Sequence, residues 1–359
     1  MPFEVRDTDR ELYSRHVAGF LPPRMIDVHT HVWLKAFVHT SSPESHIPSW
    51  PDRVAEENPI GHLLRTYELL LPGKTVTSLV FGFPRRDTPL DQSNDYVAHV
   101  ARRHGLPTLM LSTPEWSGQE VERRVEAGGF LGLKPYPSFA PSHLAAEEVT
   151  VYDFLPHSHL EVADQHGWLV MLHIPGSARL RDAVNLQHML EIERLYPRAR
   201  VIIAHVGRAY CPEDIGNAFD VLRDTEHLLF DFSANTNAYV MEQLVRAVGP
   251  KRILFGSDLP ILRMRMRRIC EDGVYVNLVP PGLYGDVSGD AHMREVSAEQ
   301  AGGLSFFMYE ELLAFRRAAE AVGLTQADLD SIFFGNAAAI IAHAGGGWRA
   351  GAGSAAWTC

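Results

Sequence analysis

The sequence predicts a (β/α)8 barrel, on three observations. The chain has 359 residues, which is long enough for one large domain. Eight short apolar runs alternate with polar, helix-like stretches, and no period of 20–50 residues repeats. The first run is not followed by the glycine-rich phosphate-binding turn that an open, doubly wound sheet normally carries. The barrel is therefore favoured over the open sheet.

Each predicted strand is almost continuously apolar. Strands that are buried on both faces have this pattern, whereas half-exposed antiparallel strands alternate. In chain order the runs begin at Met25, Thr75, Pro107, Phe130, Trp168, Arg200, Leu228 and Arg252. The stretches between them, such as EVERRVEAGG and MEQLVRAVG, are amphipathic and end near Gly or Pro, as helices do before a new strand.

Two connections are much longer than the few residues usual between a strand and a helix. They span about residues 35–73 and 260–303, after the first and eighth strands, so we expect both over the C-terminal mouth of the barrel. They are predicted either to decorate the rim or to cap a substrate. The chain up to residue 345 is predicted to be a single domain, and the Gly- and Ala-rich stretch 346–359 a loosely held tail.

The second long connection has three features of its own. Its VYVNLVPPGLYGD stretch is typical of a small hairpin. The basic stretch Arg263–Arg268 is expected on an exposed helix face or at a subunit contact, because the chain as a whole is acidic. His292, which lies in this insertion, is a candidate site residue that could reach the active site.

The charge balance limits the partners. There are 33 Lys and Arg against 44 Asp and Glu, a formal charge of −11, so no basic excess exists to neutralise nucleic acid or an anionic membrane. No apolar run approaches the roughly 20 residues of a membrane span, and the N-terminus lacks the apolar core of a signal peptide. We expect a cytoplasmic protein that acts on a small molecule, alone or as a homo-oligomer.

The three cysteines, Cys211, Cys270 and Cys359, are too few and too scattered to predict a disulfide framework or a thiolate metal site. The 18 histidines, by contrast, are unusually many. A second H-x-H pair, His157-Ser-His159, lies where a helix begins, and we expect a solvated structural role for it.

His29 and His31 close the first predicted strand. Alternate residues of a strand point to the same side, so both imidazoles are expected to face the C-terminal mouth of the barrel. Polar residues end four further strands, at the place where barrel enzymes carry their catalytic groups. They are Lys134, His173, His205 and Asp258.

Imidazole and carboxylate ligands suit a divalent metal, zinc first and manganese second. Three or four protein ligands with one open position describe a catalytic metal that activates water. Asp258 and one histidine are suited to handling the proton of that water.

Four other residues are candidate substrate contacts. Arg85 and Arg86 follow the second strand and could bind a carboxylate in a bidentate manner, although a solvated surface pair is the alternative. Tyr136 and Arg208 lie on the same rim, two and three residues beyond strand ends.

The order of these motifs resembles the amidohydrolase superfamily, in particular its amidohydrolase-2 branch. The resemblance lies in IDVHTH, GLKPY, MLHIPG, IIAHVG and LFGSDLP, and in IFFGNAAAII, which is similar to the C-terminal G-N-A signature of that branch. It covers about residues 24–343 and implies a metal-dependent hydrolase with a (β/α)8 fold.

The resemblance also implies individual roles. The residues that match the metal ligands of mononuclear members are His29, His31, His173 and Asp258. His205 would act as acid or base, or stabilise the oxyanion. In binuclear members a carboxylated lysine bridges two metals and both the fifth- and sixth-strand histidines are ligands, and Lys134 is in place for that role. An unmodified lysine cannot ligate a metal, so Lys134 could instead hold a substrate carboxylate or pair with an acidic neighbour. One metal is favoured over two.

The predicted function is hydrolysis of a small amide or lactone, which can carry a carboxylate. Asp258 would take the proton of the attacking water and His205 would stabilise the negative oxygen. Decarboxylation of an aromatic or muconate-type acid is the alternative, because the same branch contains such enzymes. A non-catalytic binding barrel is less favoured, because the whole set of ligands is present. The substrate, the metal and the oligomeric state are not determined.

Overall fold

The computed structural model describes residues 3–38 and 50–345, so the predicted tail 346–359 lies outside the described residues. All eight predicted strands are present. They are β1 (Arg24–His31), β2 (Thr75–Phe81), β3 (Met110–Leu111), β4 (Gly132–Lys134), β5 (Leu169–Leu172), β6 (Arg200–Ile203), β7 (Leu229–Asp231) and β8 (Ile253–Leu254).

These strands close into a barrel. Strands β3 to β8 form one parallel sheet, and β1 pairs in parallel with β2. Two parallel bridges join the parts, Val80 to Thr108 and Thr30 to Leu259, and a backbone hydrogen bond from Val28 N–H to the carbonyl of Phe255 strengthens the second seam. The predicted (β/α)8 fold is confirmed.

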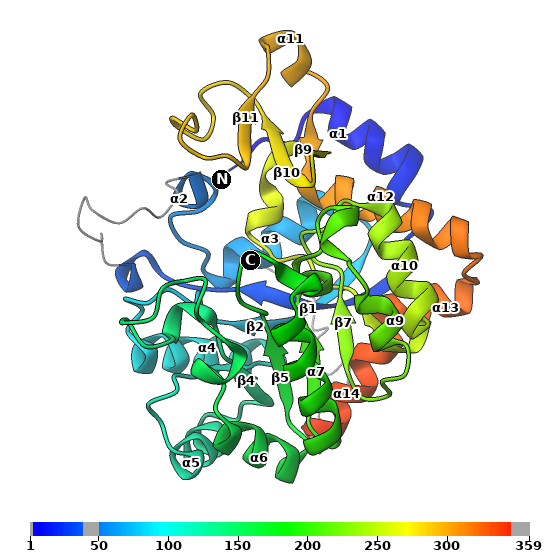
Figure 1. Ribbon diagram of the computed structural model, residues 1–359. Helices are drawn as coiled ribbons and strands as arrows, with labels where there is room; N and C mark the ends of the chain where they lie inside the picture. The colour runs from blue at the N-terminus through cyan, green and yellow to red at the C-terminus, as the bar shows by residue number, and fades with distance from the viewer. Residues whose placement is uncertain (1–2, 39–49, 346–359) are drawn as a thin grey trace.

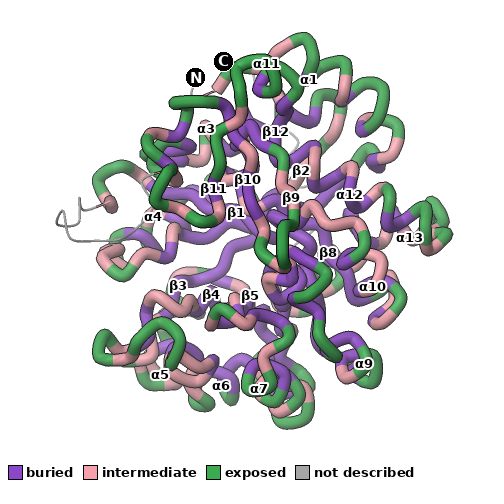
Figure 2. Tube along the Cα trace, turned by 45° about the horizontal axis from the view of Figure 1, so that its top comes forward, coloured by how far each residue is buried: buried purple, intermediate pink, exposed green. Residues whose placement is uncertain are grey.

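Two apolar clusters explain why the strands read as continuous apolar runs. One cluster fills the inside of the barrel and includes Ile26, Val28, Met171 and Ile202. The other packs the outer faces of the strands against the helices. The buried strands at the centre and the exposed outer faces of the helices are visible in Figure 2.

The main surrounding helices are α3 (Ile60–Leu70), α4 (Leu90–His104), α5 (Gly118–Gly128), α6 (His157–His166), α7 (Ala183–Leu195), α9 (Ala218–Leu222), α10 (Ala238–Val248) and α12 (Phe307–Val322). No helix in the described ranges is long and apolar enough to cross a membrane. The H-x-H pair in α6 has a structural role, and His157 is exposed as expected, but His159 is buried. His157 bonds to the hydroxyl of Tyr196, and the buried His159 bonds to the carbonyl of Trp116.

One end of the barrel is covered by α14 (Asn336–Ala344), which follows α13 (Gln326–Asp330). Ala337 and Ile341 of α14 belong to the interior cluster. The side-chain amide of Asn336 donates to the carbonyls of Pro250 and Ile253 at 2.8 and 2.9 Å. The asparagine of the G-N-A motif therefore holds α14 against the start of β8. Because α14 covers this end of the barrel, the site is expected at the opposite end.

The first insertion is shorter than predicted. Helix α3, inside the predicted span 35–73, buries Leu63, Tyr67 and Leu70 and is the regular helix between β1 and β2. The insertion proper ends near Asn58 and includes α2 (Trp50–Val54), while residues 39–49 lie outside the described part of the chain.

The second insertion forms a cap, which lies at the top of Figure 1 in yellow and orange. It consists of β9 (Arg265–Glu271), β10 (Val274–Val279), β11 (Met293–Glu295), α11 (Ala298–Ala301) and β12 (Ser305–Phe306). The hairpin predicted within VYVNLVPPGLYGD is wrong in its bounds. That stretch supplies only β10, which forms a hairpin with the preceding strand β9. The exposed helix face predicted over Arg263–Arg268 is wrong, because most of this stretch is strand β9, while the alternative of a subunit contact stays a prediction. Arg265 is buried there because Asp9 of α1 (Asp7–Leu12) neutralises it.

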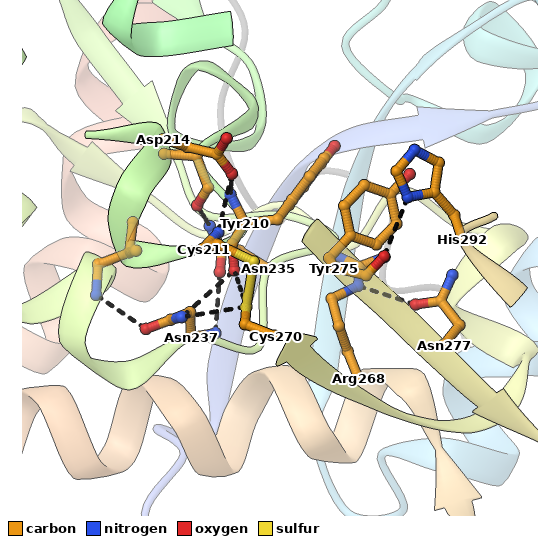
Figure 3. Close-up of a disulfide and its surroundings, with 12 residues drawn as sticks. Tyr210, Cys211, Asp214, Asn235, Asn237, Arg268, Cys270, Tyr275, Asn277 and His292 are labelled. Carbon is orange, nitrogen blue, oxygen red and sulfur yellow. Dashed lines mark hydrogen bonds between the residues drawn. A yellow bond between two sulfur atoms is a disulfide. The ribbon is translucent and has the colours of Figure 1, made fainter. Parts of the chain in front are cut away.

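The scattered cysteines did not predict a disulfide, yet one is present. Cys211, in the loop after β6, and Cys270, in β9, form a disulfide with 5.8 Å between their Cα atoms (Figure 3). The two are 59 residues apart in sequence, and only the folding of the cap back onto this loop brings them together. Disulfides persist mainly in oxidising compartments, so the cytoplasmic location stays a prediction that this bridge does not support.

Candidate metal centre

Three of the predicted ligands meet at the open end of the barrel. Nε2 of His31 lies 3.3 Å from Oδ1 of Asp258, and Nε2 of His29 lies 3.6 Å from the same oxygen. A register irregularity in β1 between Asp27 and Thr30 includes His29 and precedes His31. Gly256 lets the end of β8 come close, because a Cβ there would lie 2.9 Å from that of His29.

The hydrogen bonds of the two imidazoles define their tautomers. Nδ1 of His29 lies 2.9 Å from a carboxylate oxygen of Asp231, and Nδ1 of His31 lies 2.9 Å from the carbonyl oxygen of Gly82. Both partners only accept, so each Nδ1 carries the proton and each Nε2 keeps a lone pair. With both rings neutral, two nitrogen lone pairs and a carboxylate oxygen face one another, an arrangement that a cation between them would stabilise.

The spacing of these three atoms fits a divalent metal. Ligand atoms about 2.0–2.2 Å from a zinc ion lie about 3.3–3.6 Å apart at tetrahedral angles, which matches the two distances to Asp258. Burial lowers the pKa of His29, which keeps its imidazole neutral and able to ligate. His29, His31 and Asp258 are thus one of the groups in the described chain that could hold a metal ion.

Asp231 is the residue that the sequence interpretation missed. It ends β7, it bonds to Nδ1 of His29, and it accepts the backbone N–H of His205 at 2.8 Å. Burial opposes its charged form, but the imidazole of His29 and the hydroxyl of Ser233 hold the pKa of Asp231 below its usual value. The same attention to polar residues at strand ends, applied to LLFDFS, would have found it.

Replacing Asp231 by Asn should weaken metal binding about 10- to 100-fold, because the carboxylate that orients a metal-ligating histidine also raises its basicity. Competition with a chromophoric chelator measures this affinity. Asp220→Asn, on the exposed side of α9, is the matched control and should leave the affinity unchanged. Equal affinities for the Asp231 variant and the wild type would contradict the orienting role.

His205 lies in a left-handed turn, labelled α8 (His205–Arg208), directly after β6. Its φ is 56°, and those of Val206 and Arg208 are 53° and 61°. Such backbone is costly for residues other than glycine and clusters at functional sites. Asp258 shares it, with φ 56°. The two predicted proton-handling residues are therefore held in strained backbone by their surroundings.

The tautomer of His205 bears on its role. Its Nδ1 lies 3.1 Å from the carbonyl oxygen of Ser233, so this nitrogen carries the proton and Nε2 keeps a lone pair. Burial, together with the nearby imidazole of His29, lowers the pKa of His205 to about 4. A neutral ring with an unprotonated Nε2 accepts protons, which favours the acid/base role over that of an oxyanion donor.

His173 lies beside this group. Its ring centre is 5.1 Å from that of His205 and 4.8 Å from that of Tyr136. Burial and the neighbouring cations keep its pKa well below the usual value, and its buried Nδ1 has no hydrogen-bond partner in the described residues. An unpaired nitrogen of this kind is available to a ligand, although His173 is outside the tight group of His29, His31 and Asp258.

Lys134 is fully buried and does not line the cavity above the site. Its Nζ has no hydrogen-bond partner among the described residues. Burial lowers the pKa of Lys134 to about 8, and the carboxylates of Asp231 and Asp258 partly oppose that change. Among the described residues Lys134 therefore neither lines the cavity, as a substrate contact would, nor forms a direct pair with an acidic neighbour.

A cavity of about 900 Å³ opens above the group and reaches the cap. All four candidate substrate contacts line it, as does His292; the four are Arg85, Arg86, Tyr136 and Arg208. The described residues around it include four arginines, with Arg179, against two carboxylates, Glu147 and Asp258. The cavity is thus cationic in an acidic chain, which favours an anionic substrate.

The arginines differ in how far their charge is already neutralised. Arg85 lies near Asp52 and Asp87, and the buried Arg179 is paired with Asp214 at 2.9 Å. Arg208 donates only to carbonyl oxygens within the described ranges, to Gly176 at 2.7 Å and to Ile174. Among the described residues neither Arg208 nor Arg86 forms an ion pair, so either guanidinium can bind a carboxylate, and Arg208 is the less exposed of the two.

Asp27, the first residue of the D-x-H-x-H motif, has a positioning role. One of its oxygens accepts the backbone N–H groups of His29 and Ser257, and the other accepts the hydroxyl of Tyr67. It thereby joins the histidine-bearing end of β1 to the loop that carries Asp258. The buried carboxyl lies outside the cavity, with its pKa raised by burial to about 7.

The family model described as amidohydrolase, of the amidohydrolase-2 type, matches residues 26–342. The chain belongs to the amidohydrolase family. No curated protein matches this amidohydrolase. The family and its structural neighbours are enzymes, both hydrolases and decarboxylases, and the protein is an enzyme of this type.

Three solved structures illustrate the fold, each with 14% sequence identity. A zinc-bound amidohydrolase from Burkholderia multivorans has a TM-score of 0.52, with 89% of this chain and 99% of that chain covered. A manganese-bound dihydroxybenzoic acid decarboxylase from Polaromonas sp. JS666, with 2-nitroresorcinol, has 0.52, with 89% and 97% covered. A protein from Pseudomonas putida assigned as a 2-pyrone-4,6-dicarboxylic acid hydrolase has 0.51, with 90% and 99% covered.

Proposed function

We propose that this amidohydrolase is a metal-dependent hydrolase that cleaves a small amide or lactone bearing a carboxylate. The observation that carries the proposal is the convergence of Nε2 of His29, Nε2 of His31 and Oδ1 of Asp258 on one point at the floor of a cationic cavity. We further propose one divalent ion per chain, zinc first and manganese second, with His173 as the fourth ligand.

When bound, a divalent ion polarises a carbonyl and makes water a better nucleophile at neutral pH. The chain's own residues would do the rest. Burial opposes ionisation of Asp258, but the imidazoles of His31, His205 and His29 hold its pKa at about 2, so its carboxylate can accept the proton of the attacking water. Nε2 of His205 is a second proton acceptor, and Arg208 would hold the substrate carboxylate.

Decarboxylation is the second candidate, supported by the decarboxylases among the structural neighbours. Loss of carbon dioxide leaves a carbanion that must receive a proton. The lowered pKa values of Asp258 and His205 leave neither group protonated at neutral pH, and a nearby cation would lower both further. This chemistry favours hydrolysis.

The first experiment is the metal content per chain of protein purified without added metal or chelator, measured by plasma mass spectrometry. We expect about one equivalent of zinc or manganese. The loaded protein is then assayed on lactones, amides and carboxylated aromatics, with ester or amide cleavage and carbon dioxide release followed separately. His31→Ala should lose the metal, and His157→Ala, a histidine outside the site, should keep it.

The outcomes separate the alternatives. Two equivalents would favour a carboxylated Lys134 bridging two metals. Carbon dioxide release without cleavage of lactones or amides would replace the hydrolase by the decarboxylase. No metal, even after reconstitution, would overturn the mechanism and favour a binding protein.

A further inference from the structure

His292 lies in the cap between β10 and β11 and lines the cavity from that side. Its ring stacks on Tyr275, with ring centres 4.0 Å apart and planes 4° from parallel (Figure 3). Its backbone N–H donates to Asp290, and its carbonyl accepts the N–H of Asn277, both at 2.8 Å. The side chain is therefore held in one place rather than free at the surface.

The side chains that hold His292 in place also contact the rim of the barrel. Tyr275 makes an edge contact with Tyr210, with ring centres 4.9 Å apart, and the guanidinium of Arg268 lies 4.6 Å from both rings. Tyr210 is next to Cys211, whose disulfide to Cys270 ties this rim to β9. The cap wall is thus connected to the loop that carries His205 and Arg208.

The insertions also meet at this point. Nε1 of Trp50, in α2, donates to one oxygen of Asp290 at 3.2 Å, while the other oxygen holds the backbone of His292. Both long connections therefore contribute to positioning His292.

One ring nitrogen of His292 is left for the cavity. Its Nδ1 lies 2.9 Å from the carbonyl oxygen of Tyr275, which only accepts, so Nδ1 carries the proton in the neutral ring. Nε2 then holds a lone pair, and none of the described residues bonds to it. The cap accordingly presents a fixed hydrogen-bond acceptor to a cavity that four arginines also line.

We propose that His292 is a specificity-determining residue whose Nε2 accepts a hydrogen bond from a hydroxyl or N–H group of the substrate. The inference rests on the proposed function and narrows its substrate class. The substrate is a carboxylic acid with a hydrogen-bond donor at the end away from its carboxylate, which Arg208 holds. An acid without that donor leaves the lone pair of Nε2 desolvated and unpaired.

Matched pairs of acids test this inference by calorimetric titration of the metal-loaded full chain. The probes are 4-hydroxybenzoate against 4-methoxybenzoate, and the longer 4-hydroxycinnamate against 4-methoxycinnamate. Wild type should bind the hydroxy acid of at least one pair about tenfold more tightly, the usual value of one hydrogen bond in a desolvated site. His292→Phe keeps a flat ring on Tyr275 but has no acceptor, so both acids of that pair should bind equally.

Two further variants distinguish recognition from packing. His292→Gln retains an acceptor oxygen and should restore part of the preference. His157→Phe changes another histidine that stacks on a tyrosine, Tyr152, outside the cavity, and should keep the full preference. A structural role for His292 alone would make the phenylalanine variant behave like wild type.

Results that contradict the role of His292 can be distinguished from results that contradict the proposed hydrolase. Equal binding of both acids in both pairs by wild type, or a preference that survives His292→Phe, would overturn this inference while the metal content and turnover still supported the hydrolase. Failure of all four acids to bind would overturn the carboxylate site and the inference together.

Discussion

Asp258→Asn should reduce turnover at least about 1,000-fold, because it removes the carboxylate that accepts the proton of water and is a proposed metal ligand. Asn keeps the shape and an acceptor oxygen but has no negative charge, so Oδ1 no longer balances a cation beside Nε2 of His29 and His31. Turnover is measured on the compound that the panel identifies, with the metal content of the same preparation.

The control for this variant is Asp272→Asn, another aspartate in left-handed backbone, with φ 50°, in the turn between β9 and β10. It should keep full turnover and full metal content. An Asp258→Asn enzyme within tenfold of wild type would contradict the proposed role. Full metal content with lost turnover would assign proton transfer to Asp258 and remove it from the ligand set.

Arg265→Ala should lower the free energy of unfolding by about 3–5 kcal/mol, the usual cost of removing one partner of a buried ion pair. The guanidinium of Arg265 lies 2.6 Å from Asp9 and also donates to the carbonyl of Leu304, and both charged side chains are almost completely buried. The variant leaves the carboxylate of Asp9 buried with little compensation. Urea unfolding at pH 7 measures the change.

Arg65→Ala, which removes an exposed ion pair with Glu68 in α3, should change the unfolding free energy far less.

The pH dependence of the unfolding free energy gives a second check of the Asp9–Arg265 pair. Burial opposes the charge of Asp9, but the hydrogen bonds from Arg265, Arg6 and Ser305 hold its pKa below 3.8. Its contribution is present above that pH and disappears as the pH falls through the lower folded pKa. A variant as stable as wild type at pH 7 would contradict the importance of this pair.

The barrel could be predicted from sequence because its determinants are local. A strand covered on both faces must be apolar along its whole length, and this marked all eight strands. A polar residue at the end of such a strand stands out against that background, which located His29, His31, His173, His205 and Asp258. Asp231 was missed although it has the same position in β7.

The cap and the pairing of groups within the site could not be predicted in this way. Part of the basic stretch lies in strand β9, which pairs with β10 and β12, and its Arg265 bonds to Asp9, 256 residues away. Cys211 met Cys270 only because the cap folds over the rim. The tautomers of His29, His31 and His292 depend on Asp231, Gly82 and Tyr275, which lie on other segments or face them only after folding.

The sequence by itself thus determined the architecture and most of the residues at the mouth of the barrel, because the burial of a strand constrains each residue where it stands. Only the tertiary structure decided which ring nitrogen of each histidine has no partner, which arginines have no carboxylate partner and which segments cover the cavity. These properties depend on contacts between segments that are distant along the chain.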